Sequence, residues 1–342
     1  MTLSGGSSRE RKSGSIVRSA PRSPRVPPLP SWIGDDGRML WPLAVPRRPS
    51  RRRPVGAIDL RWLTARAWSQ RWYPQGIDVG GSASRRVVAV GWFRQDRDRR
   101  HLASRVTFVD VSRARRRDVV LVVRDEQGVL QPATIHVGGL AWYGDRLFAA
   151  ATTRGIWEFD LGDVRRVRGA EARRVTASVR STALVAVRRA VHPVDLRCSF
   201  IGRVFDEDGT PLPRVLIGEY RGDDSGRVGE FIVPDADGRA GFLPQGEFSP
   251  GIPRMQGAVR WGDQHFVSQS DDSNPGVLWS GGSDDLKRHP VALPAGCEDL
   301  AIDPDSGMLW SLGEHPWRRV VRGIPLALIG IEHGPGERRL DG

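Results

Sequence analysis

One phrase of strand, turn and strand recurs along this chain and limits what it can fold into. Its two clearest copies read Gly139-Leu-Ala-Trp-Tyr-Gly144-Asp145-Arg-Leu-Phe148 and Gly257-Ala-Val-Arg-Trp-Gly262-Asp263-Gln-His-Phe266, and looser copies begin at Gly76, Ser199 and Asp299. A Gly-Asp pair between two apolar runs is typical of a hairpin turn, because glycine adopts positive φ at little cost. A spaced repeat of such hairpins predicts an all-β fold, a single β-propeller.

The spacing of the copies sets the expected number of blades. The anchors Gly76, Gly139, Ser199, Gly257 and Asp299 lie 63, 60, 58 and 42 residues apart, which predicts five blades with long loops. Six blades stay open if residues 56–72 and the segment after Arg319 together form another sheet. The alternating run from Ile58 to Trp62 suits a strand that closes the ring from the N-terminal side, and residues 60–72 could instead form a helix.

The positive charge of the chain is concentrated in its first 55 residues. This segment holds twelve Lys and Arg against three acidic residues, a balance of +9, whereas residues 56–342 hold 40 basic and 37 acidic residues, a balance of +3. Its Arg/Pro/Ser-rich composition cannot bury enough apolar surface to offset the ordering of the chain. We therefore predict a disordered basic tail over 1–55 and the propeller domain over 56–342, and we do not expect nucleic acid as a partner.

Three sequence patterns are absent, and their absence sets what we expect of the cellular compartment and of the two cysteines. The sequence has no run of about 18 apolar residues, and its first residues lack the apolar core of a signal peptide. We expect no membrane span, a monomer, and a cytoplasmic location as the sequence is written, or secretion if the start is mis-assigned. Cys198 and Cys297 form no C-x-x-C motif, which argues against zinc; two buried thiols are expected, and a disulfide stays open.

The repeat also places polar residues at one end of the ring. The innermost strand of each propeller blade lines the central channel, so residues just before the anchors should meet at one mouth. The residues placed there by the register are Gln75, His136, Arg197, Gln256 and Glu298. We predict that they bind a small polar ligand; alternatively, they satisfy buried backbone groups and hold the blades together. A protein partner in place of a small ligand stays open.

A hydrolase acting on glycosidic bonds is the alternative function. It needs two carboxylates facing across a pocket, and the candidates on or near the innermost strands are Asp78, Asp195, Glu298 and Asp299. No nucleophile elbow, phosphate-binding loop or histidine metal motif is present. The acidic, glycine-containing segments that begin at Asp206, Asp235 and Asp303 resemble calcium loops but lack the closing Glu, so we interpret them as turns and expect no cofactor, with calcium as the weaker alternative.

Five phrases in order along the chain carry a family resemblance. They are Pro74-Gln75-Gly76-Ile77, His136-Val-Gly138-Gly139-Leu140, Cys198-Ser-Phe200-Ile201, Met255-Gln256-Gly257-Ala258 and Glu298-Asp299-Leu300. This series resembles a family of bacterial, often secreted, β-propeller proteins without an assigned biochemical function, over roughly residues 70–325. The resemblance implies the fold and export, and it supplies no catalytic residues.

Overall fold

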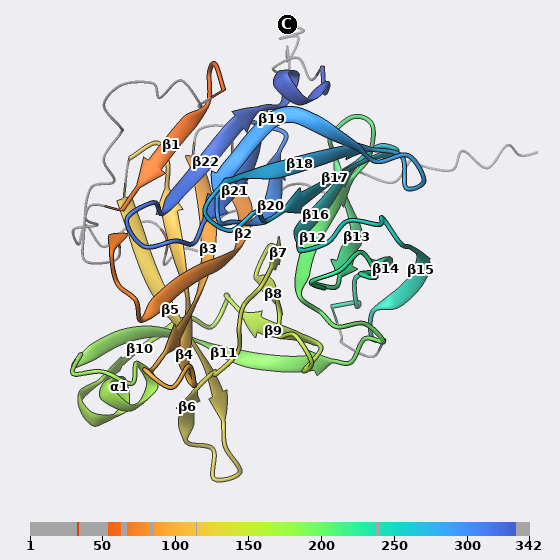
Figure 1. Ribbon diagram of the computed structural model, residues 1–342. Helices are drawn as coiled ribbons and strands as arrows, with labels where there is room; N and C mark the ends of the chain where they lie inside the picture. The colour runs from red at the N-terminus through yellow and green to blue at the C-terminus, as the bar shows by residue number, and fades with distance from the viewer. Residues whose placement is uncertain are drawn as a thin grey trace, which may run out of the picture.

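The structure is a computed structural model that describes residues 33, 54–62, 67–82, 85–113, 115–236 and 240–332. The predicted tail over 1–55 therefore lies outside the described residues, apart from Ile33, Pro54 and Val55. The described chain is built almost entirely of β-strands, with one α-helix and a short 3-10 helix near the C-terminal end of the described chain (Figure 1).

The strands pair as five antiparallel units of four strands each within the described residues. Unit one contains β2 (Trp72–Ser82), β3 (Arg85–Gln95), β4 (His101–Asp110) and β5 (Arg115–Arg124), and unit two contains β7 (Leu140–Tyr143), β8 (Arg146–Ala150), β9 (Ile156–Asp160) and β11 (Thr182–His192). Unit three contains β12 (Phe200–Phe205), β13 (Pro211–Gly218), β14 (Val228–Ile232) and β15 (Leu243–Phe248), and unit four contains β16 (Met255–Trp261), β17 (Gln264–Gln269), β18 (Pro275–Gly281) and β19 (Lys287–Ala295). Unit five contains β20 (Cys297–Asp303), β21 (Met308–Gly313), β22 (Val320–Pro325) and β1 (Ile58–Arg61).

The first strand of each unit faces the centre of the molecule. β2, β7, β12, β16 and β20 contact one another in that order, and β20 returns to β2, so the ring closes (Figure 1). This arrangement of antiparallel units around a common axis is a β-propeller, and the predicted fold is confirmed. Parallel pairing joins β5 to β11 and β12 to β16 and merges four units into two larger sheets, so the number of blades stays a prediction.

The glycines of the repeated phrase allow the innermost strands to approach closely. A Cβ added to Gly139 would lie 2.3 Å from the backbone nitrogen of Ile201, in the next unit. A Cβ added to Gly257 would lie 2.6 Å from the nitrogen of Leu300, again in the next unit. Real Cβ atoms do not come this close to backbone, so glycine is required for the strands to pack at this distance.

An aspartate takes the place of glycine in the fifth copy and connects unit five to units one and two. Asp299 is fully buried, and its Oδ2 accepts hydrogen bonds from the backbone N–H groups of Ile77 (3.0 Å) and Leu140 (3.1 Å). The anchor position therefore joins neighbouring units by backbone contact in some copies and by a carboxylate in this one.

The N-terminal strand closes the ring, as predicted from the alternating run at Ile58. β1 pairs antiparallel with β22, with Ile58 opposite Gly323. Arg322 of β22 donates to both carboxylate oxygens of Asp59 at 2.7 and 2.9 Å, and both side chains are buried. The alternative helix over 60–72 does not form as a whole, because β1 continues to Arg61 and β2 begins at Trp72.

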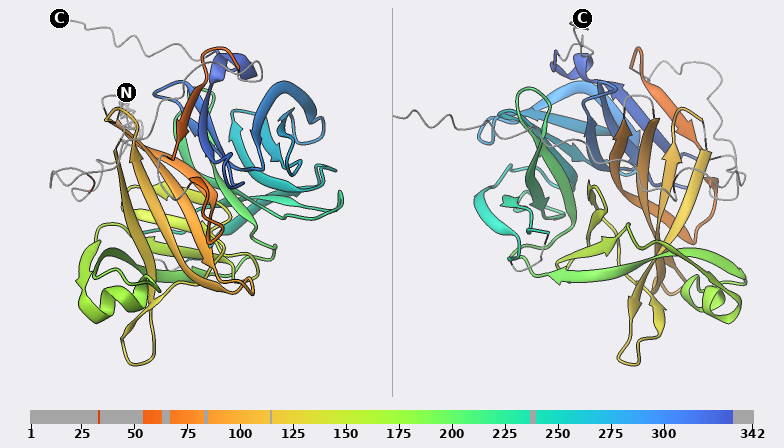
Figure 2. Two further views of the ribbon diagram at one scale, coloured as in Figure 1. Left: turned by 60° about the vertical axis from the view of Figure 1, so that its left-hand side comes forward. Right: turned by 180° about the vertical axis from the view of Figure 1, so that it is seen from behind.

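Unit two reaches its outer strand by a long detour that the repeat pattern does not predict. After β9 the chain forms β10 (Arg165–Arg168) and α1 (Gly169–Val175) before β11 completes the unit. α1 packs near β6 (Leu130–Pro132), which pairs with β5, and these elements form an extension beside the ring (Figure 2). A 3-10 helix, η3 (Leu326–Ile329), follows β22.

A glycine-to-alanine substitution tests the close approach of the innermost strands. We expect Gly257→Ala to lower the free energy of unfolding by about 3 kcal/mol, because the new methyl group must displace backbone of unit five. Gly282→Ala is the matched control, since a Cβ there meets no atom within 4 Å. Chemical unfolding of the three proteins measures the difference; equal midpoints for the two variants would show that the strands tolerate a wider spacing.

Candidate functional site

A polar pocket lies at the mouth of the ring, near the starts of the innermost strands. Its volume is about 500 Å³, and all five units contribute residues to it. The pocket is lined by each of the five residues that the repeat register predicted: Gln75, His136, Arg197, Gln256 and Glu298. The structure thus brings them together from distant parts of the chain, and their binding of a ligand stays a prediction.

The side chain of Gln75 makes more hydrogen bonds than those of the other four predicted residues. Its Nε2 donates to the carbonyl oxygen of Pro74 (3.0 Å) and to Oε2 of Glu314 (2.7 Å). A carbonyl oxygen only accepts, so the contact with Pro74 determines which end of the amide is nitrogen. Both amide hydrogens are then in use, and Oε1 of Gln75 faces Nε2 of His136 at 2.6 Å. Because an amide oxygen only accepts, Nε2 of His136 carries the proton.

His136 is consequently a neutral hydrogen-bond acceptor at its other nitrogen. Burial, together with the nearby His101 and Arg197, lowers the pKa of His136 to about 4. A neutral imidazole with its one proton on Nε2 has a lone pair on Nδ1. The ring stacks on Phe93, with centroids 4.4 Å apart, and lies 5.4 Å from the ring of His101.

Glu298 differs from the other carboxylates in being buried without a protein partner. Its side chain lines the pocket, and the residue is 2% exposed. Its backbone carbonyl accepts from Ser268, but no described residue donates a hydrogen bond to its carboxyl group. Burial raises the pKa of Glu298 well above its usual range, and the negative charges of Glu314 and Asp299 add to this. Both effects favour the protonated form, in which Glu298 can donate to a ligand.

Glu314 is a pocket residue that the sequence did not predict. It follows β21 in the loop 314–319, outside the innermost strands, and its carboxylate accepts from Gln75. Burial raises its pKa, whereas His315, Gln75 and Arg319 oppose the rise. The repeat register could not find Glu314, because the register aligns only the starts of the innermost strands.

Two guanidinium groups stand at the exposed side of the pocket. Arg154 and Arg197 both line it and both are exposed. Arg154 donates to the carbonyl oxygen of Thr134 at 3.3 Å, and Arg197 is positioned by its backbone N–H, which donates to Glu219 (3.1 Å). Neither guanidinium forms an ion pair with a carboxylate of the described residues.

Several residues around the pocket have a backbone conformation that side chains disfavour. Val137, Thr152 and Arg254 have φ angles of 58°, 56° and 56°. Val137 directly follows His136, Thr152 lines the pocket, and Arg254 lies two residues before Gln256. A positive φ is costly for residues other than glycine, above all for β-branched ones, and such residues gather at functional sites.

The structure does not bring the other predicted carboxylates into this pocket. Asp78 accepts from the N–H of Trp142 (2.6 Å) and pairs with Arg203 (2.9 Å), so it links units one, two and three. Asp299 links units as described above, and Asp195 is exposed outside the pocket lining. Of the four candidates for glycosidic catalysis, only Glu298 lines the pocket.

Both cysteines are buried, and the acidic segment at Asp206 forms a turn. Cys198 and Cys297 are buried free thiols, and burial raises the pKa of each. Asp206 accepts from the backbone of Thr210 (2.7 Å), as in a turn. In the described part of the chain, no group of three or more His, Cys, Asp or Glu side chains is arranged to hold a metal ion; calcium binding stays a prediction that these contacts do not test.

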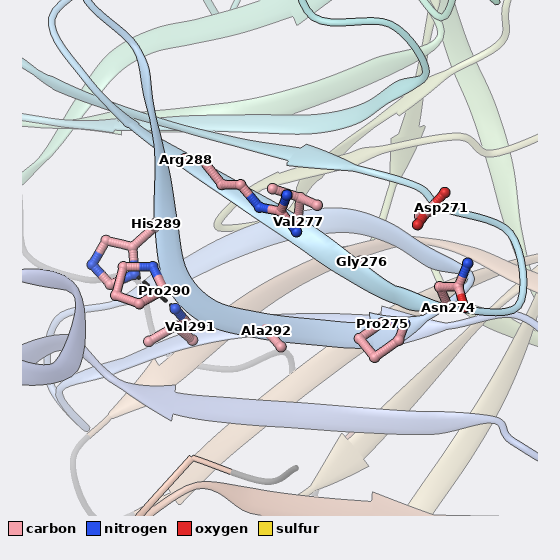
Figure 3. Close-up of a pocket in the computed structure, with 10 residues that line it drawn as sticks. All are labelled: Asp271, Asn274, Pro275, Gly276, Val277, Arg288, His289, Pro290, Val291 and Ala292. Carbon is pink, nitrogen blue, oxygen red and sulfur yellow. Dashed lines mark hydrogen bonds between the residues drawn. The ribbon is translucent and has the colours of Figure 1, made fainter.

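A second pocket, of about 410 Å³, lies over β18 and β19 in unit four (Figure 3). Most of its lining residues are apolar or glycine; Asp271 and Asn274 lie at one end, and Arg288 and His289 lie toward the other (Figure 3). The imidazole of His289 accepts from the backbone N–H of Val291 at 3.1 Å. None of the predicted binding residues lines this pocket, so we take the mouth pocket as the candidate site.

Comparison with known proteins gives structural similarity only. No family model matches the chain, and no curated protein matches it. The resemblance to a bacterial, often secreted family therefore stays a prediction.

Among solved structures, the chain is similar to the Cps50 (Swd1) β-propeller domain of Myceliophteria thermophila, with 12% identity, a TM-score of 0.34, and coverage of 70% of this chain and 93% of that chain. It is also similar to glutaminyl cyclase of Myxococcus xanthus, with 10% identity, a TM-score of 0.36, and coverage of 74% and 94%. A third similar structure is the GH43_1 enzyme of Xanthomonas citri, with 9% identity, a TM-score of 0.41, and coverage of 77% of this chain and 90% of that chain. We transfer no activity from these proteins.

None of the described helices has the length and apolar character needed to cross a membrane.

The proton position on His136 can be measured directly. We expect ¹⁵N–¹H long-range correlation spectra to show a protonated Nε2 and a bare Nδ1 at neutral pH, with no titration of this ring down to about pH 5, because its pKa is about 4. His136→Gln identifies the signals. A ring that takes up a proton between about pH 7 and 6 would contradict the lowered pKa, and a bare Nε2 at neutral pH would contradict the hydrogen-bond chain through Gln75.

Proposed function

We propose that this protein is a propeller-based binding protein that holds a small polar ligand in the mouth pocket. The observation that carries the proposal is the Glu298 carboxyl group, which is buried, faces the pocket and has no partner among the described residues. A polar group of a buried residue needs hydrogen-bond partners, and a ligand in the pocket would supply them to Glu298.

The groups around Glu298 suit a ligand with several hydroxyl, amide or acid groups. In the protonated form that burial favours, Glu298 both donates and accepts, the Gln256 amide does the same, and Nδ1 of His136 accepts. The pocket volume of about 500 Å³ falls in the range of small-molecule sites. The strained backbone at Val137, Thr152 and Arg254 also supports a binding site, because such strain lowers stability and is typical of functional sites. A protein partner, the compartment and the monomeric state stay predictions.

A thermal-shift screen with and without Glu298 tests the proposal. The probes are neutral and acidic monosaccharides, free amino acids, nucleotides and Ca²⁺. A probe at about a hundred times its dissociation constant adds about 2.7 kcal/mol of stability. We expect at least one organic probe to stabilise the wild-type protein and to lose that effect in Glu298→Ala.

Glu126→Ala serves as the control, because Glu126 is exposed and outside the pocket lining. A wild-type protein that no organic probe stabilises would refute the proposal, and so would a probe that stabilises wild type and Glu298→Ala equally.

Hydrolysis of a glycosidic bond is the second candidate function, and one observation favours it. Glu298 and Glu314 line the same pocket, and burial raises the pKa of both. A protonated carboxyl beside a second carboxylate is the pairing that glycosidases use, with the protonated group as the general acid. In this reading Glu298 would protonate the leaving oxygen, and Glu314 would act as nucleophile or base.

Chromogenic substrates test this second function. We expect the wild-type protein to release 4-nitrophenol from a member of a 4-nitrophenyl glycoside panel and to release sugar from the methyl glycoside of the same sugar. Glu298→Gln should reduce the rate on the methyl glycoside by about a hundredfold or more, because the amide cannot donate a proton to the leaving oxygen. No release by the wild-type protein across the panel, or an undiminished rate of the variant on the methyl glycoside, would exclude the hydrolase.

A further inference from the structure

Two arginines of the mouth pocket lack the carboxylate partners that comparable arginines of the propeller have. Arg203 pairs with Asp78 at 2.9 Å, and Arg146 pairs with Glu158 at 2.8 Å. By contrast, Arg154 contacts only a carbonyl oxygen, and the guanidinium of Arg197 makes no hydrogen bond or ion pair with any described residue. The two arginines come from units two and three and line the same pocket.

The inner part of the pocket does not neutralise these guanidinium groups. Burial raises the pKa of Glu298 and lowers the pKa values of His101 and His136, which favours the uncharged form of all three groups. Glu314 already accepts from Gln75, and it lies beside Arg319, whose Nε donates to the backbone oxygen of Glu314 (2.7 Å). The pocket therefore combines a positive exposed side with a polar interior in which Glu314 already has a hydrogen-bond donor.

We propose that the ligand is a small polyhydroxylated carboxylate, such as a sugar acid, whose carboxylate binds to Arg154 and Arg197 while its hydroxyl groups face Glu298 and Gln256. This inference rests on the proposed function of the pocket. Arginine has a planar fork of N–H donors that matches the two oxygens of a carboxylate, and such charge-assisted contacts are about twice as strong as neutral ones. The acid–amide pair in the interior is suited to hydroxyl groups, which both donate and accept.

The test compares ligands that share one ring and differ in charge. The probes are D-glucuronate, D-glucose, D-glucosamine and D-glucose 6-phosphate, measured by isothermal titration calorimetry at low and high salt. We expect glucuronate to bind at least tenfold more tightly than glucose and glucosamine, and its advantage to shrink in high salt, as an exposed ion pair requires. We expect glucose 6-phosphate to bind more weakly than glucuronate.

Substitutions of Arg154 and Arg197 test whether these two residues cause the tighter binding of glucuronate. Arg154→Gln and Arg197→Gln should each weaken glucuronate binding by about tenfold, and the double variant should bind glucuronate no better than glucose. Arg124→Gln is the matched control: Arg124 is exposed, donates to the carbonyl oxygen of Gly128 at 3.3 Å as Arg154 does to Thr134, and does not line the pocket. It should leave binding unchanged.

The outcomes separate this inference from the proposed function. Equal or tighter binding of glucose or glucosamine would overturn the carboxylate class and leave the ligand site in place. Tighter binding of glucose 6-phosphate than of glucuronate would show that the site prefers a phosphate to a carboxylate. If the double variant still prefers glucuronate to glucose, the two arginines do not bind the carboxylate. If none of the four probes binds, and the wider thermal-shift screen finds no organic ligand either, the proposed function itself fails.

Discussion

The structure depends on the close contact of five innermost strands around one axis. Where the repeated phrase has glycine, at Gly139 and Gly257, the missing side chain lets the backbone of the next unit come within reach. Where it has Asp299, a buried carboxylate accepts backbone N–H groups from two other units. These contacts fix the distance between units, and the pairing of β1 with β22 then closes the ring.

The same ring of strands creates the pocket. The residues just before the anchors, three of them within the innermost strands, line the mouth pocket. Their number and chemistry differ from copy to copy: an amide at Gln75, an imidazole at His136, a guanidinium at Arg197 and a carboxyl at Glu298. Anchors that hold the units together, with variable residues beside them, give a rigid frame whose binding groups can change without loss of the fold.

Burial then separates carboxyl groups that look alike in the sequence. Asp299 and Glu298 are adjacent and both buried, but their carboxyl groups have different surroundings, at a point where the pairing of β20 with β21 is irregular. Asp299 accepts two backbone N–H groups between units, whereas Glu298 meets only the pocket. One carboxyl is thus part of the architecture, and the other is available for a ligand.

The sequence by itself determined the propeller class, the closing strand at Ile58 and the gathering of five polar residues at one mouth, because all three follow from a period that is local and repeated. Only the tertiary structure decided the rest. It assigned Asp78 and Asp299 to contacts between units, left Asp195 at the surface, and brought Glu314 into the pocket from a loop outside the repeat. It also placed β11 beside β9 across an intervening helix. Such partners are set by distance in space, and a one-dimensional period carries no information on which side chain meets which across the ring.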